Sequence, residues 1–454
     1  MGAQLSGPII ELHAPLAEQV PSVFVDAADT LNIFAPVFIT GFLITLAATP
    51  VVRKVAVLAG VIDAPDRLRK HHSAPIAYLG GLAVFIGFMA AMLMSFIAIE
   101  GDAADLAPVP ISILIGATAI ALTGLADDIW KWDARLKIAG QLVAAAALAV
   151  SDIGIGAVTG VLQPFFGAPT EVLFSIGSIS VMCGDLYYWV GTFFLGFVII
   201  AGCNAANLID GLDGLLAGST TIMASGFLAI ALLLASTVTT DDPTTSLAGV
   251  RVTIALALLG TMLGFLPWNF NPAVIFLGDC GSLLIGYLCV TTVLLFGEQG
   301  SPSLVVAGFI IFGLPIVDTS LAIIRRKLAG VPMNTPDANH LHHQMKRSLG
   351  TVKKAVFSLY GITLAFTLLG VAVAAIKLLS TTRVLVIYSI GAALFGMVIA
   401  VAVKVAMIQR WSAATHSAIS DGTESAESTN SAASIPSTAA EQLPPARTPT
   451  DIAV

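Results

Sequence analysis

Charged residues are scarce in this sequence: Asp, Glu, Lys and Arg make up only 11% of its 454 residues, whereas 57% are hydrophobic. A chain with so little charge cannot cover an ordinary soluble surface, so a soluble globular protein is excluded. The four cysteines form neither a CxxC pair nor the spacing of a secreted disulfide framework, so they indicate no redox role. The modest net charge of −7 gives no argument for binding nucleic acid, and no such partner is expected.

Apolar runs of about 20 residues, long enough to cross a bilayer as helices, recur along nearly the whole chain. They predict an all-α, polytopic membrane bundle of about eleven transmembrane helices. The segment 152–186 is more polar and Gly-rich, so we expect an excursion at the outer face with short strands or re-entrant structure. We place the helices near residues 32–50, 79–99, 109–126, 136–151, 187–206, 219–238, 249–266, 282–297, 303–322, 355–376 and 384–408.

Lys and Arg concentrate in the loops 51–78, 127–137 and 323–354, whereas the intervening loops carry mainly acidic residues. Because basic residues near span ends stay in the cytoplasm, we expect an outside N-terminus and an inside C-terminus. Residues 1–31 form an outer segment that lacks the basic start of a cleaved signal peptide. Residues 32–410 form the membrane domain, and 411–454, rich in Ser, Thr, Ala and Pro, form a disordered cytoplasmic tail.

The informative polar residues fall in the loops expected at the cytoplasmic face. Asp127 and Asp128 are adjacent at the end of a predicted helix, where a carboxylate pair can bind a divalent cation or accept a proton. An acidic pair that merely caps an inner loop is the alternative interpretation. Asp279 stands between two glycines before an apolar run, which suits Mg²⁺ because this ion takes one or two protein carboxylates and completes its shell with phosphate oxygens. A helix N-cap by Asp279 is the alternative.

A second polar run lies between two apolar helices and contains Asn204, Asn207, Asp210 and Asp213. The last three are spaced three residues apart, so they share one helical face or line one turn. Such groups are costly at membrane depth unless they bind something, although a network that only fastens helices together would also explain them.

The histidines His340, His342 and His343 form a cluster in a basic loop. Neutral imidazoles bind zinc well, but no cysteine lies nearby. The cluster is more typical of an anion site, where donors hold a pyrophosphate together with Arg325, Arg326 and Lys346. A loop that only anchors at anionic lipid headgroups is the remaining alternative.

In their order along the chain, these motifs resemble those of the polyprenyl-phosphate N-acetylhexosamine-1-phosphate transferase family. The segment 63–81 matches the first motif of the family in chain order, and the resemblance as a whole covers about residue 40 to about residue 405. It is closest to bacterial enzymes that load undecaprenyl phosphate with GlcNAc-1-phosphate. The resemblance implies a UDP-sugar donor, an undecaprenyl phosphate acceptor held in membrane lipid, release of UMP, and Mg²⁺ as cofactor with Mn²⁺ as a substitute. The product would initiate a cell-envelope polysaccharide such as the lipopolysaccharide O-antigen, and a homodimer is compatible with it.

The same resemblance implies roles for individual residues. Asp279 would bind the metal, while Asp127 and Asp128 would face the lipid phosphate, one of them accepting its proton. Asp210 and Asp213 are further catalytic candidates beside the nucleotide sugar. The other substrate-binding candidates are Lys70, Lys137, Asn204, Asn207, Asn269, His340, His342 and His343.

Three alternatives remain open at this point. A peptidoglycan-type transferase would use UDP-MurNAc-pentapeptide in place of UDP-GlcNAc. A transporter would place broken helices in matching halves of an internal repeat, with polar sites near the midplane. A non-catalytic scaffold of a glycan pathway would bind lipid or partner proteins without releasing UMP.

Overall fold

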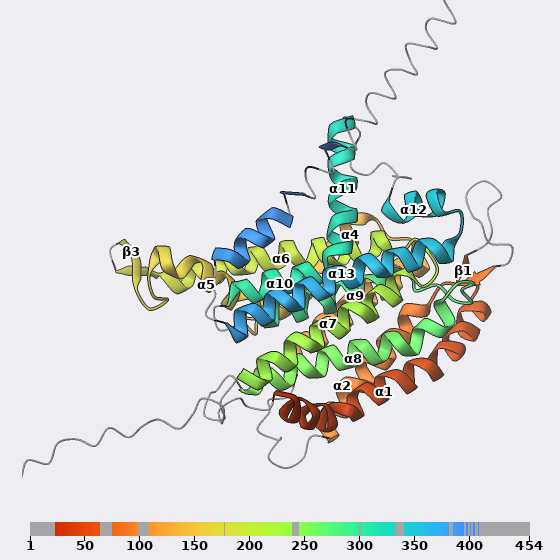
Figure 1. The fold of residues 1–454 in the computed structure, drawn as a ribbon, viewed down its shortest axis with the longest axis horizontal. Helices are drawn as coiled ribbons and strands as arrows, with labels where there is room; N and C mark the ends of the chain where they lie inside the picture. The colour runs from red at the N-terminus through yellow and green to blue at the C-terminus, as the bar shows by residue number, and fades with distance from the viewer. Residues whose placement is uncertain are drawn as a thin grey trace, which may run out of the picture.

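The structure is a computed structural model that describes residues 23–63, 75–98, 109–176, 178–237, 245–298, 301–330, 332, 340–380 and 385–394, with isolated positions to 407 (Figure 1). Helices dominate these residues, and the strands form two small antiparallel pairs. The all-α prediction is therefore confirmed. Residues 1–22 of the predicted outer segment and the whole predicted tail 411–454 lie outside the described residues.

The long helices follow the predicted apolar runs, and most extend a few residues beyond them. The extension arises because polar residues at the run ends stay helical, as Asp127 and Asp128 do in the last turn of α3. The helices of the first half are α1 (Val23–Leu58), α2 (Gly80–Ala98), α3 (Ile111–Trp130), α4 (Ala134–Ala149) and α6 (Cys183–Ile209). Those of the second half are α7 (Leu215–Thr237), α8 (Thr245–Asn269), α9 (Gly278–Phe296) and α13 (Val352–Leu379).

Eight described helices are long and apolar enough to cross a membrane, or nine when a bent pair is counted as one span. Helix α4 has only 16 residues and the helix at 385–394 is also short, so the predicted number of about eleven is not confirmed. Large apolar side chains point outward from the bundle: Val150 is 82% exposed and Phe193 is 79% exposed. An outer surface of this kind is stable in lipid and not in water, and the protein is a membrane protein.

The prediction of one continuous span at 303–322 is wrong. The chain forms α10 (Pro302–Ile311) and α11 (Gly313–Ala329), whose axes differ by 78°. Pro315 in the first turn of α11 has no N–H group to continue the hydrogen bonds of α10, so the helix breaks just before it. Helix α11 leaves the bundle steeply in Figure 1 and carries part of the predicted basic loop in helical form.

Helix α9 is the innermost of the long helices, because 94% of the residues in its apolar stretch are buried. It contacts α2, α3, α6, α7, α8 and α10. Glycines make these close approaches feasible. A methyl group on Gly124 of α3 would lie 2.5 Å from the backbone of Asp279, and one on Gly202 of α6 would lie 2.2 Å from Val290. Small residues at helix crossings are the usual means of close packing in a bilayer.

Short elements mark the two ends of the bundle. Helix α5 (Ile155–Phe166) and the hairpin of β3 (Val172–Ile176) and β4 (Ile179–Met182) form one end, which confirms the predicted strands in 152–186, although α5 was not predicted. Strands β1 (Ile62–Asp63) and β2 (Ile76–Ala77) and helix α12 (Leu341–Leu349) lie toward the opposite end (Figure 1).

Candidate active site

The start of α9 is fixed by main-chain hydrogen bonds to the chain that enters α2. The amide of Phe276 donates to the carbonyl of Ala77 over 2.8 Å, and the amides of Gly80 and Gly81 donate back to the 276–277 carbonyls over 2.9 and 2.7 Å. Two segments almost 200 residues apart in sequence thus act as one support. They hold Asp279 in the first turn of α9.

Asp128 of α3 caps α9 from outside. Its two carboxylate oxygens accept the amide hydrogens of Asp279 and Cys280, at 2.8 and 3.0 Å. These amides lack partners within their own helix, and a carboxylate also complements the positive end of the helix dipole. Gly278 permits this contact: its φ is +72°, and a methyl group there would lie 2.6 Å from Asp128 Oδ2. The interpretation of Asp279 as the N-cap is therefore wrong.

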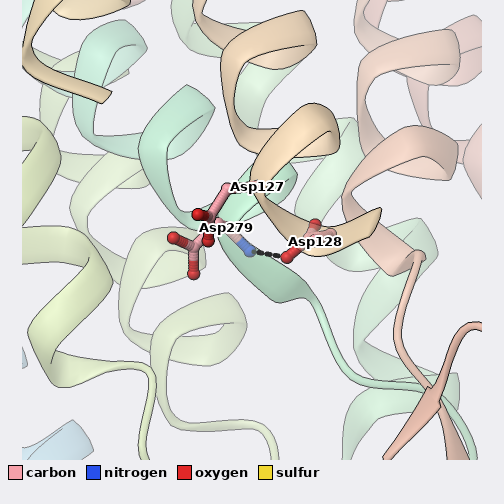
Figure 2. Close-up of side chains that lie close together, drawn as sticks. All are labelled: Asp127, Asp128 and Asp279. Carbon is pink, nitrogen blue, oxygen red and sulfur yellow. Dashed lines mark hydrogen bonds between the residues drawn. The ribbon is translucent and has the colours of Figure 1, made fainter. Parts of the chain in front are cut away.

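Asp127, Asp128 and Asp279 offer one oxygen each within 4.8 Å of one another, and we call these three residues the acidic cluster (Figure 2). Lys137 of α4 joins two of them. Its ammonium lies 2.8 Å from Asp127 Oδ2 and 2.6 Å from Asp279 Oδ2. Three carboxylates face one ammonium, so the cluster attracts further positive charge.

Asn207 supports the cluster from α6. Its side-chain amide donates to Asp279 Oδ1 over 2.9 Å and lies the same distance from Ser282 Oγ. Asn207 thus contacts Oδ1 of Asp279, whereas Lys137 contacts Oδ2 of the same carboxylate. Ser282 was not identified from the sequence, although its position three residues after Asp279 puts both side chains on one face of α9.

The donor set of the acidic cluster suits a hard divalent cation, because carboxylate oxygens from two helices converge without any sulfur or imidazole ligand. The resemblance assigned the metal to Asp279, and the fold brings beside it Asp127 and Asp128, the adjacent pair that the sequence offered either for a divalent cation or for accepting a proton. Each carboxylate retains lone pairs in addition to those used by its present hydrogen bonds. Lys137 would have to share or yield its contacts when a cation binds.

The chain turns immediately after α6, because that helix ends at Ile209. Asn207, Asp210 and Asp213 consequently do not share one helical face: Asn207 is in the last helical turn, and the other two belong to the turn 210–214. Asp213 Oδ2 accepts hydrogen bonds from the Asn271 side chain at 2.8 Å and the Ala273 amide at 3.1 Å. The carboxylate therefore fastens the turn 210–214 to the segment before α9.

Asn269 fastens the same turn from the end of α8. Its side-chain oxygen accepts the amide hydrogen of Gly214 at 3.1 Å, and its nitrogen donates to the carbonyl of Ile275 at 3.1 Å. Asp210, by contrast, lies in the electrostatic field of the acidic cluster. Burial raises the pKa of Asp210 to about 8, and the negative charges of Asp279 and Asp128 add to the increase.

Asn204 contacts a neighbouring helix and not the acidic cluster. Asn204 donates to Gln141 Oε1 over 3.1 Å and to the carbonyl of Ile200 over 2.8 Å, so it ties α6 to α4. This arrangement matches the helix-fastening alternative. Lys70 lies outside the described residues.

The histidine motif, defined as His340, His342 and His343, lies at the start of α12. His342 is only 2% exposed and packs on the turn 210–214, where a methyl group on Gly211 would lie 2.1 Å from His342 Nε2. Burial lowers the pKa of His342 to about 4, and the neighbouring His343 adds to the decrease. His342 is therefore a neutral imidazole near pH 7, able to donate one hydrogen bond.

The histidine motif has a buried acidic partner that was not identified from the sequence. Asp318 of α11 is 1% exposed, and its Oδ2 lies 3.0 Å from His340 Nδ1. A signal was present, because Asp318 is the single charged residue in the predicted span 303–322, and such a residue at membrane depth usually has a function.

These features define a polytopic membrane protein in which acidic, amide and basic side chains from distant helices converge at one end of the bundle, as a site for phosphorylated substrates would require. A family model described as "Glycosyl transferase family 4" matches residues 110–297. The chain belongs to this family, and it is an enzyme.

Three curated relatives agree with this membership. The chain is 35% identical to the probable undecaprenyl-phosphate N-acetylglucosaminyl 1-phosphate transferase of Bacillus subtilis, over 73% of this chain and 82% of that protein. It is 34% identical to the decaprenyl-phosphate N-acetylglucosaminephosphotransferase of Mycolicibacterium smegmatis, over 73% and 79%. It is 30% identical to the undecaprenyl-phosphate alpha-N-acetylglucosaminyl 1-phosphate transferase of Escherichia coli, over 70% and 77%. The resemblance drawn from the motifs is confirmed.

Proposed function

We propose that the protein transfers N-acetylglucosamine-1-phosphate from UDP-GlcNAc to a polyprenyl phosphate, with undecaprenyl phosphate as the preferred acceptor, and releases UMP. The observation that carries this proposal is the contact of Lys137 with Asp127 and Asp279 at the start of the buried helix α9. The relatives named for this reaction support the same assignment. The product is the lipid-linked sugar that begins a cell-envelope polysaccharide.

In the proposed reaction, an oxygen of the lipid phosphate attacks the phosphorus next to the sugar. A new P–O bond forms, the bond from this phosphorus to the bridging oxygen of the diphosphate breaks, and its electron pair leaves with UMP. The Lys137 ammonium sits where charge on the transferring phosphoryl group can be offset. A single displacement and a route through an aspartyl-phosphate both use these residues, and a trapped phosphoaspartate at Asp128 would exclude the single displacement.

The acidic cluster would hold the divalent cation, Mg²⁺ or in its place Mn²⁺, through Asp279 with Asp127 and Asp128 beside it. Such an ion, when bound, neutralises phosphate charge and orients the diphosphate. Asn207 keeps Asp279 in place for this purpose, and Asp213 and Asn269 keep the turn 210–214 beside the nucleotide-sugar pocket.

The site is proposed to face the cytoplasm of a bacterial inner membrane. Strand β1 and helix α12 lie toward the same end of the bundle (Figure 1), and the loops that flank them carry Lys and Arg. Basic loops of this kind are retained on the cytoplasmic side. A lipid phosphate at that surface would reach the cluster while its tail stays in the bilayer.

Purified protein in detergent, with Mg²⁺ and undecaprenyl phosphate, should be offered UDP-GlcNAc, UDP-GalNAc and UDP-MurNAc-pentapeptide in separate reactions. We expect UMP release with UDP-GlcNAc, together with a lipid product whose mass equals undecaprenyl diphosphate plus one GlcNAc. Release only with the pentapeptide donor would make the protein a peptidoglycan-type transferase. Absence of UMP with every donor, from protein that unfolds cooperatively, would contradict the proposed activity.

A further inference from the structure

Asp318 is a buried carboxylate whose two oxygens both contact the start of α12. Oδ1 accepts the amide hydrogen of Leu341 at 2.6 Å, and Oδ2 lies 3.0 Å from His340 Nδ1 and 3.9 Å from His342 Nδ1. A carboxylate with 1% exposure is retained in a protein interior only where such partners compensate for its lost hydration. Asp318 and the motif thus form one unit built from α11 and α12.

The first consequence concerns the start of α12. His340 occupies the N-cap position, and its own side chain makes no capping hydrogen bond to the helix. Asp318 caps the first amide instead, from another helix, and the negative charge also complements the helix dipole. Because His342 and His343 lie in the first turn of α12, this contact sets where both rings stand.

The second consequence concerns the protons of the rings. A carboxylate can only accept a hydrogen bond, so Nδ1 of His340 carries the hydrogen that it donates to Asp318, and Nε2 of the neutral ring is left as an acceptor. A carboxylate fixes the tautomer of a catalytic or metal-bound histidine in the same way. The His340 and His342 rings are stacked at 5.6 Å with planes 12° apart, so the orientation of one constrains the other.

The third observation connects this unit to the substrate region. His342 Nε2 faces Gly211 in the turn 210–214, and its Nδ1 has no hydrogen-bond partner in the described chain. The same turn is fastened to the segment before α9 by Asp213. A displacement of the histidine motif would therefore shift the turn 210–214, which under the proposed function lies beside the nucleotide sugar.

We infer that Asp318 is a positioning residue for the transfer reaction: it anchors the histidine motif to α11 and keeps His340 in the Nδ1–H tautomer, so that the motif holds its place against the turn 210–214 beside the donor site. This inference rests on the proposed function. Asp318 itself touches no substrate, and it acts through His340 and His342.

The decisive variant is Asp318→Asn. Asparagine keeps an oxygen that can cap Leu341 but turns an NH₂ group toward His340, which favours the opposite tautomer. We expect kcat/KM for UDP-GlcNAc to fall about 10- to 100-fold, as for other residues that orient a functional histidine. Thr319→Val is the matched control: the neighbouring hydroxyl is buried without a hydrogen-bond partner among the described residues, and its loss should leave the rate unchanged.

A double-mutant cycle separates positioning from general stability. In a His340→Ala background, Asp318→Asn should have little further effect, because the residue it acts through is gone. The inference would be overturned if the rate losses of the two single variants multiplied in the double variant, or if Asp318→Asn kept the wild-type rate. UMP release by the wild type would leave the proposed function intact in either case. Should the variant not fold, ¹⁵N-histidine spectra of the wild type decide: a proton on Nδ1 of His340, assigned by its loss in His340→Gln, is expected, and a proton on Nε2 alone overturns the inference.

Discussion

Replacing Lys137 with methionine should change metal affinity and activity in opposite directions. The ammonium lies against Oδ2 of Asp127 and Oδ2 of Asp279, two carboxylates of the cluster that would hold a divalent cation. At about 4 Å, a single and a double positive charge repel by roughly 8 kcal/mol at an effective dielectric constant of about 20. The side chain of Lys137 is 26% exposed, so it can swing toward water and relieve most of this repulsion. A remaining repulsion of about 1.4 kcal/mol between the ammonium and the cation corresponds to a tenfold change in the affinity for the cation.

We therefore expect Lys137→Met to bind Mn²⁺ about tenfold more tightly in the absence of substrates, measured by electron paramagnetic resonance titration of the detergent-purified protein. UMP release by the same variant should fall about 100-fold or more, because positive charge is lost beside the transferring phosphoryl group. Arg135→Met is the matched control, since Arg135 is exposed on the same helix and should alter neither quantity. Weaker or unchanged Mn²⁺ binding by Lys137→Met alone would refute the competition between ammonium and metal.

Three further substitutions test other parts of the site. Gly278→Ala forces a side chain into φ +72° and against Asp128, so UMP release and the unfolding temperature should both fall, whereas Gly361→Ala, with open space around it, should be neutral. Asp210→Asn should raise the unfolding temperature more at pH 8 than at pH 5. The pKa of this carboxyl is about 8 in the folded state and 3.8 in the unfolded state, so the native state of the wild type loses stability as pH rises between these values. An equal gain in unfolding temperature at both pH values would contradict the raised pKa. Gly211→Ala should push His342 away from the turn 210–214 and raise the KM for UDP-GlcNAc; an unchanged KM would show that this contact does not affect the donor.

The helices could be predicted from the sequence because an apolar run in a bilayer must satisfy its backbone internally, which leaves few alternatives. The bend before Pro315 was missed because hydropathy continues across it without interruption. Helix α12 was missed for the opposite reason: its histidines and basic residues resemble a loop by composition, and capping by Asp318 comes from a different helix.

Motifs in the sequence identified most residues of the site, but the contacts between these residues could not be predicted from it. Asp128 and the amide it caps are 151 residues apart, and Lys137 and Asp279 are 142 apart. No local periodicity records such a pairing, since it arises only when α3, α4 and α9 pack together. Ser282, three residues after Asp279, and Asp318, the single charged residue of a predicted span, were not identified as site residues, because their roles depend on the partners that the fold gives them.

The account depends most on the acidic cluster as the site of transfer. The most direct test is the rate of UDP-GlcNAc-dependent UMP release by Asp127→Asn, Asp128→Asn and Asp279→Asn, beside Asp133→Asn as an exposed control that only caps α4. We predict losses of about 10²–10⁴-fold for each cluster variant and a near wild-type rate for the control. Wild-type release by folded Asp279→Asn protein would contradict the assignment of the cluster as the active site.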